Sequence, residues 1–301
     1  MIRSKVAPAI DILLSPAVLL SAITLKFVRR MGVNIMPVSR KILSRVGVFP
    51  IEDHYYEPLF NAAHLNSDFD KPRELPAVDW NAETQLQLLH DLAPFATEVP
   101  RLPNTAFSGA DAEYWYCVIR FLKPRRIIEV GSGYSTRIAI NALAANGSGC
   151  THVCIEPYEQ PWLEKSGATV VRKRLEDVDK SVFRELQSGD ILFIDSSHII
   201  RPQGDVLTEV LEILPLLAPG VVVHFHDIFS PRHYHYKWVA EEVRFWNEQY
   251  LLEAFLSDNA QWEILGALNY VKHEYYDALK RVCHSLTANQ EPGSFYIRRK
   301  S

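Results

Sequence analysis

The sequence predicts an α/β protein with a seven-stranded, mostly parallel sheet, helices on both faces and a helical N-terminal extension. Two observations support this prediction. From Arg126 onward, short apolar runs alternate with helical stretches, and the first run leads directly into a glycine-rich loop. Runs that are apolar on both faces are typical of a parallel sheet that helices cover on both sides.

The predicted strands are short and closely spaced. Five of them alternate with helical stretches: 126–130, 151–155, 168–172, 191–194 and 221–225. Two more strand-like runs lie near the C-terminus: 262–268 and 294–298. Two late strands after five alternating ones fit a seven-stranded sheet better than the six-stranded dinucleotide-binding fold.

Helical periodicity marks the segments around these strands. The clearest case is 111–122, where apolar residues recur at helical spacing and Asp111 is a candidate N-terminal cap. The other predicted helices are 81–92, 162–165, 136–146, 205–217, 236–255 and 275–283.

Residues 1–75 form a basic helical extension in this prediction, and residues 76–301 form the α/β domain, with the boundary in the polar, Pro-rich stretch 68–76. The first 50 residues favour two helices with a break near Met36-Pro37. Within them, 12–25 is free of charge, but a bilayer-spanning helix needs about 20 residues. We therefore expect a helix that packs on the main domain or rests on an anionic membrane.

Charge is distributed unevenly along the chain. Residues 1–50 hold eight of the 32 Lys/Arg and one of the 36 Asp/Glu, which leaves 24 basic and 35 acidic residues, a net charge of −11, in the remainder. Such a body repels a phosphate backbone, so nucleic acid is not an expected partner. The four cysteines form no C-x-x-C pair, and we expect reduced thiols in a cytoplasmic protein, either free in the cytoplasm or peripheral on the inner membrane face.

The segment 127–136 (IIEVGSGYST) carries the strongest functional signal. Gly131 permits a tight turn after the strand, and Gly133 lets the backbone approach a ligand in front of a helix N-terminus. Glu156 lies 23 residues beyond Gly133, at the end of the second predicted strand. A carboxylate there can accept hydrogen bonds from both hydroxyls of a ribose, so the pattern indicates an adenosyl ligand.

Four motifs resemble those of class I S-adenosylmethionine (SAM)-dependent methyltransferases, which have a Rossmann-like fold. They are EVGSGYST (129–136), CIEP (154–157), DILFIDSSH (190–198) and PGVVVHFHDIF (219–229), and the similarity covers roughly 107–300. Thr136 stands where a dinucleotide-binding loop has its third glycine. The resemblance implies that SAM lies across the carboxyl ends of the strands, and it gives Phe107, Ser108 and Glu113 a place beside the pocket. The implied cofactor-binding residues are Glu129, Gly131, Ser132, Gly133, Tyr134, Ser135, Glu156, Asp195 and Ser196.

The candidate catalytic residues lie at the ends of the fourth and fifth predicted strands: Asp195, His198, His226 and Asp227. Two mechanisms fit them. In the first, Asp195, His226 and Asp227 bind Mg²⁺, which lowers the pKa of an acceptor hydroxyl. This arrangement is similar to that of metal-dependent small-molecule and sugar O-methyltransferases, which usually have an acid or Asn where this chain has His226. In the second, His198 or His226 removes the proton directly.

The remaining histidines are expected to be structural. His224 alternates with His226 along one predicted strand and is interpreted as a core residue, whereas His233 and His235 are expected in a solvated loop. The aromatic residues of 234–246 are interpreted mainly as helix packing.

The sequence thus predicts a methyltransferase (EC 2.1.1.-) that acts on a small-molecule or saccharide hydroxyl. Two alternatives stay open at this point. One is an NAD(P)-dependent oxidoreductase on a related fold, against which Thr136 and the two late strands count. The other is a non-catalytic SAM-binding scaffold that docks on membranes through residues 1–50.

Overall fold

The computed structural model describes residues 2–59, 62–66, 68–100, 106–147, 149–158 and 160–300, and it divides into two units, 1–66 and 67–301. The division falls before the Pro-rich stretch and not at 75/76, where the sequence placed it. Arg73 explains the difference, because its backbone N–H donates to the Pro231 carbonyl at 3.0 Å and its guanidinium pairs with Glu253. The Pro-rich stretch therefore belongs to the second unit.

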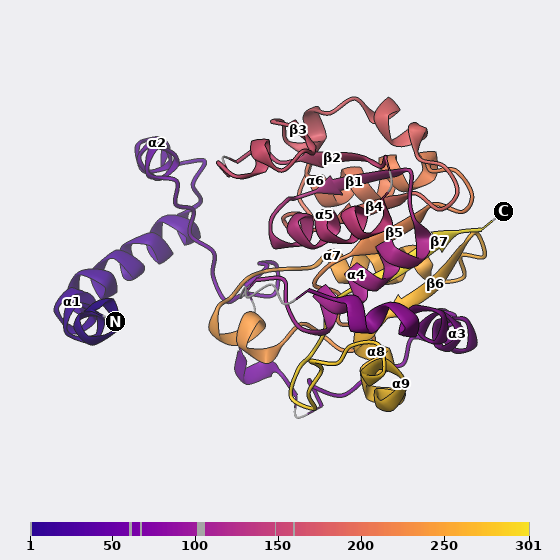
Figure 1. Cartoon of the computed structure of the whole chain (residues 1–301). Coiled ribbons are helices and arrows are strands. Elements are labelled where there is room, and N and C mark those ends of the chain that lie inside the picture. The colour runs from indigo at the N-terminus through magenta and orange to yellow at the C-terminus, as the bar shows by residue number, and fades with distance from the viewer. Residues whose placement is uncertain are drawn as a thin grey trace. The chain divides into compact units, whose positions relative to one another are not determined.

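One seven-stranded sheet in the order β3-β2-β1-β4-β5-β7-β6 forms the centre of the second unit (Figure 1). The strands are β1 (Arg126–Val130), β2 (Thr151–Ile155), β3 (Thr169–Val171), β4 (Ile191–Ile194), β5 (Val222–Phe225), β6 (Trp262–Ala267) and β7 (Phe295–Arg299). Strands β1 to β5 pair in parallel, and β7 runs antiparallel to both β5 and β6. The sheet confirms the predicted strands and differs from the dinucleotide-binding order 3-2-1-4-5-6 by the antiparallel β7.

The two faces of the sheet contribute to separate cores, because successive side chains of a strand point to opposite sides. Ile127 joins one core and Ile128 the other. The first core is completed by α3 (Ala82–Leu92), α4 (Ala110–Leu122), α5 (Tyr134–Asn146), α8 (Leu268–Glu274) and α9 (Tyr276–Lys280). The second core is completed by the π-helical turn Thr208–Ile213, which follows α6 (Asp205–Leu207), and by α7 (Glu248–Leu256). The helices leave the carboxyl ends of β1, β2, β4 and β5 on one edge, where the predicted site residues lie.

The predicted helix 236–255 is wrong in its first half. A short π-helical turn, Lys237–Glu241, is followed by irregular backbone, and α7 begins only at Glu248. Val243 and Phe245 both adopt positive φ, which bulky side chains rarely do outside functional segments. The segment is held in place because the backbone N–H groups of Asn247 and Glu248 donate to the His198 carbonyl.

Three smaller predictions also need correction. Gly109 and not Asp111 is the N-cap of α4, and the Asp111 carboxylate instead accepts hydrogen bonds from the backbone of Gly293 and Ser294. The predicted helix 275–283 is the shorter helix α9, and α8 directly before it was not predicted as a helix. The segment 162–165 is a single 3-10 turn, Leu163–Lys165.

The first unit contains α1 (Ile2–Met31) and α2 (Pro37–Val46), which confirms the two predicted helices and the break before Pro37. The chain after α2 is tied back to the end of α1. Glu57 pairs with Arg29, and Glu52 lies 3.5 Å from the Arg30 guanidinium.

Candidate functional site

The glycine loop between β1 and α5 packs directly against the end of β4. Gly131 has φ +80°, and a Cβ atom there would lie 2.0 Å from the Asp195 carbonyl oxygen. The Asp195 N–H donates to the Val130 carbonyl at 2.9 Å. Only glycine fits at this contact, so the loop and the candidate catalytic aspartate form one structural unit.

The first turn of α5 is anchored to a buried carboxylate. Thr136 Oγ1 accepts a hydrogen bond from the Gly133 N–H at 3.1 Å and donates to Glu129, whose other oxygen lies 3.0 Å from His152 Nε2. Burial alone would lower the pKa of His152, but the Glu129 charge outweighs it and raises that pKa to about 10. Glu129 is fully buried and both its oxygens are engaged. The structure therefore gives Glu129 a role in holding the loop, and its direct contact with a cofactor stays a prediction.

Glu156 keeps acceptor capacity for a ligand at the end of β2. One carboxylate oxygen accepts from the Ser132 N–H at 3.1 Å and the other from the Tyr158 N–H at 2.9 Å. A carboxylate oxygen can accept two hydrogen bonds, so each retains one free acceptor position. Ser132 Oγ is buried with no hydrogen-bond partner among the described residues, and a Cβ on Gly133 would meet no described atom within 4 Å. The unpaired Ser132 hydroxyl, the space at Gly133 and the free acceptor positions of Glu156 fit the polar groups of an adenosyl ligand.

The remaining predicted cofactor-binding residues, Tyr134, Ser135 and Ser196, lie in three different environments. Tyr134 is partly exposed on the first turn of α5, under the Arg137 guanidinium. Ser135 is buried, and its carbonyl accepts from the Trp115 indole at 3.2 Å. Ser196 follows Asp195 and lies beside the buried Glu209. Contacts of these three residues with a cofactor stay predictions.

Asp195, His198 and Asp227 converge at the ends of β4 and β5. One potential ligand atom from each lies within 4.8 Å of the other two. His198 Nε2 is 3.3 Å from an Asp195 oxygen and 3.8 Å from an Asp227 oxygen. His198 and Asp227 both have positive φ, 60° and 59°. Non-glycine residues adopt this conformation at a cost, and they cluster at active sites where the surrounding structure imposes it.

A buried glutamate that the sequence did not single out orients His198. The His198 Nδ1 atom lies 2.7 Å from Glu248 Oε2, and the Trp246 ring centroid lies 4.3 Å from that of the imidazole. Burial by itself would lower the pKa of His198, but Asp195 and Glu248 raise it well above its ordinary value. The sequence does offer one signal for this position, because Asn247, a typical N-cap residue, stands directly before Glu248 and indicates the start of a helix there.

His226 also lies near the same two aspartates. Its Nδ1 atom is 3.5 Å from Asp195 and 3.7 Å from Asp227. Burial acts to lower the pKa of His226, but the charges of Asp227 and Asp195 raise it to about 9. The Phe107 ring centroid lies 4.8 Å from that of His226. The cluster whose potential ligand atoms lie within 4.8 Å of one another thus contains His198. The predicted ligand set, in which His226 takes that place beside Asp195 and Asp227, stays a prediction.

His224 is a core residue, as expected, stacked on Tyr296 with 4.0 Å between the ring centroids. Both of its ring nitrogens lack hydrogen-bond partners within the described part of the chain, and burial lowers its pKa well below the ordinary value.

His233 and His235 are half-buried against aromatic rings, so the expected solvated loop is wrong. Glu113 is one of the residues before β1 that the resemblance places beside the pocket. In the structure, its carboxylate accepts hydrogen bonds from the backbone N–H and the hydroxyl of Ser285.

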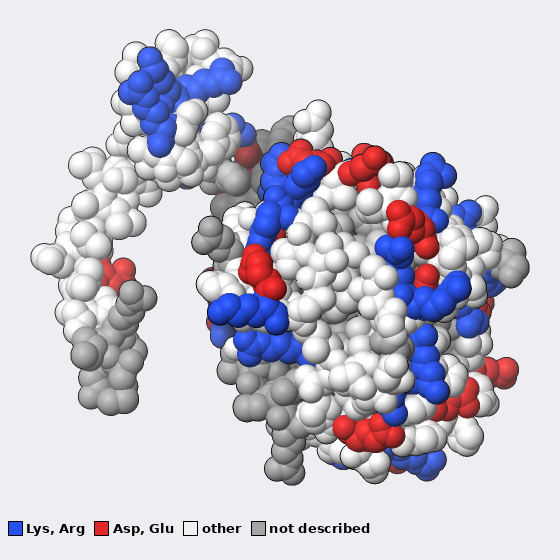
Figure 2. All heavy atoms as spheres, turned by 45° about the horizontal axis from the view of Figure 1, so that its top comes forward, with Lys and Arg blue, Asp and Glu red and all other residues white. Residues whose placement is uncertain are grey.

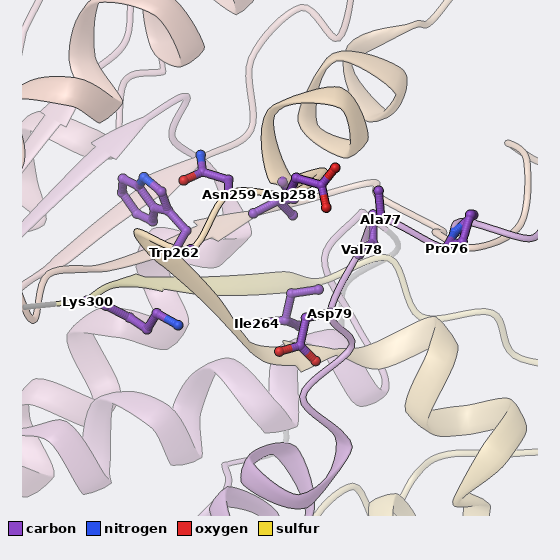
Figure 3. A pocket seen from close by; sticks show the side chains of 11 residues that line it. Pro76, Ala77, Val78, Asp79, Asp258, Asn259, Trp262, Ile264 and Lys300 are labelled. Carbon is purple, nitrogen blue, oxygen red and sulfur yellow. The ribbon is translucent and has the colours of Figure 1, made fainter.

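A separate pocket lies at the opposite edge of the sheet (Figure 3). It has a volume of about 420 Å³ and lies between the chain around Asp79, the turn at Asp258 and the side chain of Lys300. Lys300 follows β7, whose Arg298 pairs with Val222 at the start of β5. This pocket contains none of the predicted site residues.

Comparison with known proteins agrees with the geometry. Residues 128–228 match the model of a family described as "Methyltransferase domain". An uncharacterized protein of Archaeoglobus fulgidus is 26% identical over 169 residues, which are 48% of this chain and 76% of that protein.

Several solved structures are similar to the chain. An O-methyltransferase from Bacillus cereus in complex with SAH has 15% identity and a TM-score of 0.41, over 78% of this chain and 94% of that one. The O-methyltransferase TomG from Streptomyces achromogenes, involved in tomaymycin synthesis and in complex with SAM, has 15% identity and a TM-score of 0.41, over 80% and 97%. The MycE methyltransferase in complex with Mg, SAH and mycinamycin VI has 13% identity and a TM-score of 0.39, over 70% and 54%.

The sheet order, the glycine loop and the family match agree with a class I SAM-dependent methyltransferase. Residues 128–228, which match the family model, contain the glycine loop and the strands β2 to β5. The predicted fold is confirmed, and the family match over 128–228 supports the predicted enzyme class and its SAM cofactor, whereas Mg²⁺ stays a prediction. The oxidoreductase alternative is not favoured, because the Thr136 side chain is built into the loop and β7 separates β5 from β6.

Proposed function

We propose that this enzyme methylates a hydroxyl group of a small molecule or saccharide at the carboxyl ends of β4 and β5. The observation that carries the proposal is the convergence of Asp195, His198 and Asp227 directly beside the glycine loop. A hydroxyl becomes a good nucleophile only as it loses its proton, so an O-methyltransferase needs proton-accepting or charge-stabilising groups next to the methyl donor.

The cofactor supplies an electrophilic methyl group on a sulfonium. The chain provides a binding site for it: the Gly131 turn brings the loop close to Asp195, Gly133 leaves room for a ligand, and Glu156 keeps two free acceptor positions. We assign the ribose hydroxyls to Glu156 and the methionine end of the cofactor to the loop around Gly133.

Asp195, His198 and Asp227 fit a divalent cation, because two carboxylates and an imidazole present ligand atoms within 4.8 Å. Such an ion lowers the pKa of a bound hydroxyl and fixes its orientation. Glu248 supplies the outer support that metal-binding histidines usually have, since it fixes the imidazole through Nδ1 and leaves Nε2 facing the two aspartates. An imidazole in the set favours Mn²⁺ or a similar borderline ion over Mg²⁺.

Transfer of labelled methyl groups from SAM tests this proposal. The acceptors are a panel of catechols, phenols and simple glycosides, each assayed with EDTA and after addition of Mg²⁺ or Mn²⁺. We expect methyl ethers as products and at least about a tenfold loss of rate with EDTA. Full activity in EDTA would refute the cation and favour direct proton removal by His198. Methylation of amines or carboxylates alone would refute the hydroxyl acceptor.

Calorimetry with S-adenosylhomocysteine tests the cofactor site independently of the acceptor. Gly131→Val and Glu156→Ala are each expected to weaken binding at least about tenfold. Gly131→Val loses the loop conformation, and Glu156→Ala loses two charge-assisted hydrogen bonds with the ligand. Glu164→Ala is the matched control, because this glutamate pairs with Arg172 on the surface. Unchanged affinity in both loop variants would contradict the assigned cofactor site.

A further inference from the structure

α1 is long, apolar and exposed. Its segment Val6–Met31 has 26 residues, the most apolar 18-residue window in it has a mean hydropathy of 2.0, and none of that window is buried. At about 1.5 Å per residue, the segment is about 39 Å long, more than the about 30 Å of a bilayer's hydrocarbon core. The helix continues on both sides of the 14-residue charge-free stretch, so it is longer than the sequence pattern suggested.

The apolar side chains of α1 surround the helix and do not form one stripe. Two runs of three consecutive large apolar residues are exposed: Ile12–Leu14 and Val18–Leu20. Consecutive residues lie about 100° apart around a helix, so each run covers most of the circumference. A helix that is apolar all round belongs in a protein core or a membrane span, and the first unit buries none of the most apolar window of α1.

Two of the three hydroxyl groups within this apolar stretch bond to the helix itself. Ser15 Oγ donates to the Ile12 carbonyl at 2.9 Å, and Thr24 Oγ1 donates to the Leu20 carbonyl at 2.8 Å. Hydrogen bonds of this kind remove the cost of placing a polar group in hydrocarbon. The charged residues lie toward the ends, with Asp11 at one side and Lys26 at the other.

α2 has a different character. Val38, Ile42 and Val46 recur every four residues and are exposed, whereas Lys41 and Arg45 lie on another side of the helix. Figure 2 shows the Lys and Arg side chains gathered on this helix, whereas 12–25 of α1 contains no charged residue. Short helices with one apolar and one basic face lie in the interface of anionic membranes.

We propose that α1 spans a lipid bilayer and that α2 lies on its anionic surface, so that the methyltransferase domain is membrane-anchored. Arg29 is paired with Glu57, and Arg30 approaches Glu52, so these pairs fold the chain after α2 against the end of α1. Lys41 and Arg45 then provide the cationic contacts with lipid headgroups.

The distribution of charge also orients the helix. In this sequence two basic residues precede the apolar stretch, and six follow it up to the end of α2: Lys26, Arg29, Arg30, Arg40, Lys41 and Arg45. The side with more Lys and Arg stays in the cytoplasm. The domain after α2 therefore faces the cytoplasm, where SAM is available.

Alkaline carbonate extraction of membranes from cells that express the full chain tests the span. We expect the protein to stay in the membrane pellet with its N-terminus intact by mass spectrometry. The variant Leu13→Lys/Leu19→Lys is expected to lose at least about tenfold of its pelleted fraction, since each lysine at the centre of a span costs about 3 kcal/mol. Leu211→Lys is the matched control, because Leu211 is 61% exposed and Leu19 is 63% exposed.

Each other outcome refutes a defined part of the proposal. Complete release of the unmodified chain by carbonate would show that α1 only rests on the surface, and removal of α1 by cleavage would show a signal sequence. Equal pelleting of the double variant would show that α1 is not the anchor. A thermal unfolding transition shared by the released variant and the Leu211→Lys control separates loss of anchoring from misfolding.

Resistance to trypsin in reconstituted vesicles tests the role of α2. The full chain is reconstituted for this test. In phosphatidylglycerol vesicles, Lys41→Glu/Arg45→Glu is expected to make the chain after α2 less resistant to trypsin. In phosphatidylcholine vesicles, its resistance is expected to stay unchanged. Equal resistance in the anionic vesicles would refute the headgroup contacts, whereas the carbonate result for α1 stands independently.

Discussion

Two clusters of ligand-type side chains in this domain differ sharply although their composition is similar. Glu129, His152 and Cys154 are all buried, and Asp195 and Asp227 in the second cluster are partly exposed around His198. In the first cluster, the Glu129 oxygens bind Thr136 and His152. In the second, the histidine is fixed from behind by Glu248 and presents Nε2 to two aspartates.

The comparison shows that residue type does not separate a structural cluster from a reactive one. What differs is access and backbone conformation, because His198 and Asp227 are held at positive φ whereas Glu129 and His152 sit on regular strands. The first cluster stabilises the glycine loop, and the second carries the proposed chemistry. Each of the following variants affects one cluster and should leave the other intact.

The largest expected effect is on turnover. Asp195→Asn and Asp227→Asn should each reduce methyl transfer by about 10³-fold or more, since each removes a charge next to the reacting hydroxyl. S-Adenosylhomocysteine affinity should stay within a few-fold, measured by calorimetry. Asp177→Ala, at an exposed surface pair with Arg174, is the control. An equal, large loss of cofactor affinity would show that the aspartates hold the cofactor instead.

The largest expected loss of stability comes from the buried cluster. His152→Gln leaves the Glu129 carboxylate buried without its cationic partner, which should cost about 3–5 kcal/mol of unfolding free energy. Denaturant titration measures this loss, and His90→Gln at an exposed position is the control. Turnover per folded molecule should stay within a few-fold of the unmodified enzyme. A stable but inactive variant would move His152 into the catalytic machinery.

Glu248 is expected to act as a positioning residue. Glu248→Gln should weaken the apparent affinity for Mn²⁺ by about 10–100-fold, because the His198 ring loses its orientation, and excess Mn²⁺ should restore most of the rate. Cofactor affinity should not change. Loss of rate without any change in the metal titration would exclude the positioning role.

The same buried pair predicts a pH dependence of stability. The pKa of His152 is about 10 in the folded protein and about 6.5 in an unfolded chain. Its contribution is therefore complete below about pH 6.5 and is lost as the pH rises through about 10, with a slope of at most about 1.4 kcal/mol per pH unit. Denaturant titrations between pH 7 and 10 should show a steeper fall for the unmodified protein than for His152→Gln. Parallel curves would contradict the buried ion pair.

Local patterns predicted the backbone around the glycine loop well. The Gly131 turn, the strand β1 and the acid at the end of β2 follow from short motifs, because the chain there forms its contacts within about 25 residues. All seven strands were also predicted within two residues of their observed ends, because their uniform apolar composition leaves few alternatives.

The catalytic half was less predictable because remote segments complete it. Glu248 is 50 residues from His198 and lay inside a predicted continuous helix, whose apolar periodicity hid the break before Asn247. The positive φ values of Val243 and Phe245 depend on tertiary contacts and leave no sequence signal. Likewise, the charge-free stretch of α1 underestimated the length of the helix, because the helix continues through Asp11 and Lys26.

Titration of Mn²⁺ into the enzyme–S-adenosylhomocysteine complex, followed by electron paramagnetic resonance, tests the distinction between the two clusters most directly. We expect one site per chain that Asp227→Asn abolishes and Glu129→Gln preserves. Binding that survives Asp227→Asn and disappears in Glu129→Gln would place the metal in the buried cluster and contradict the proposed catalytic site.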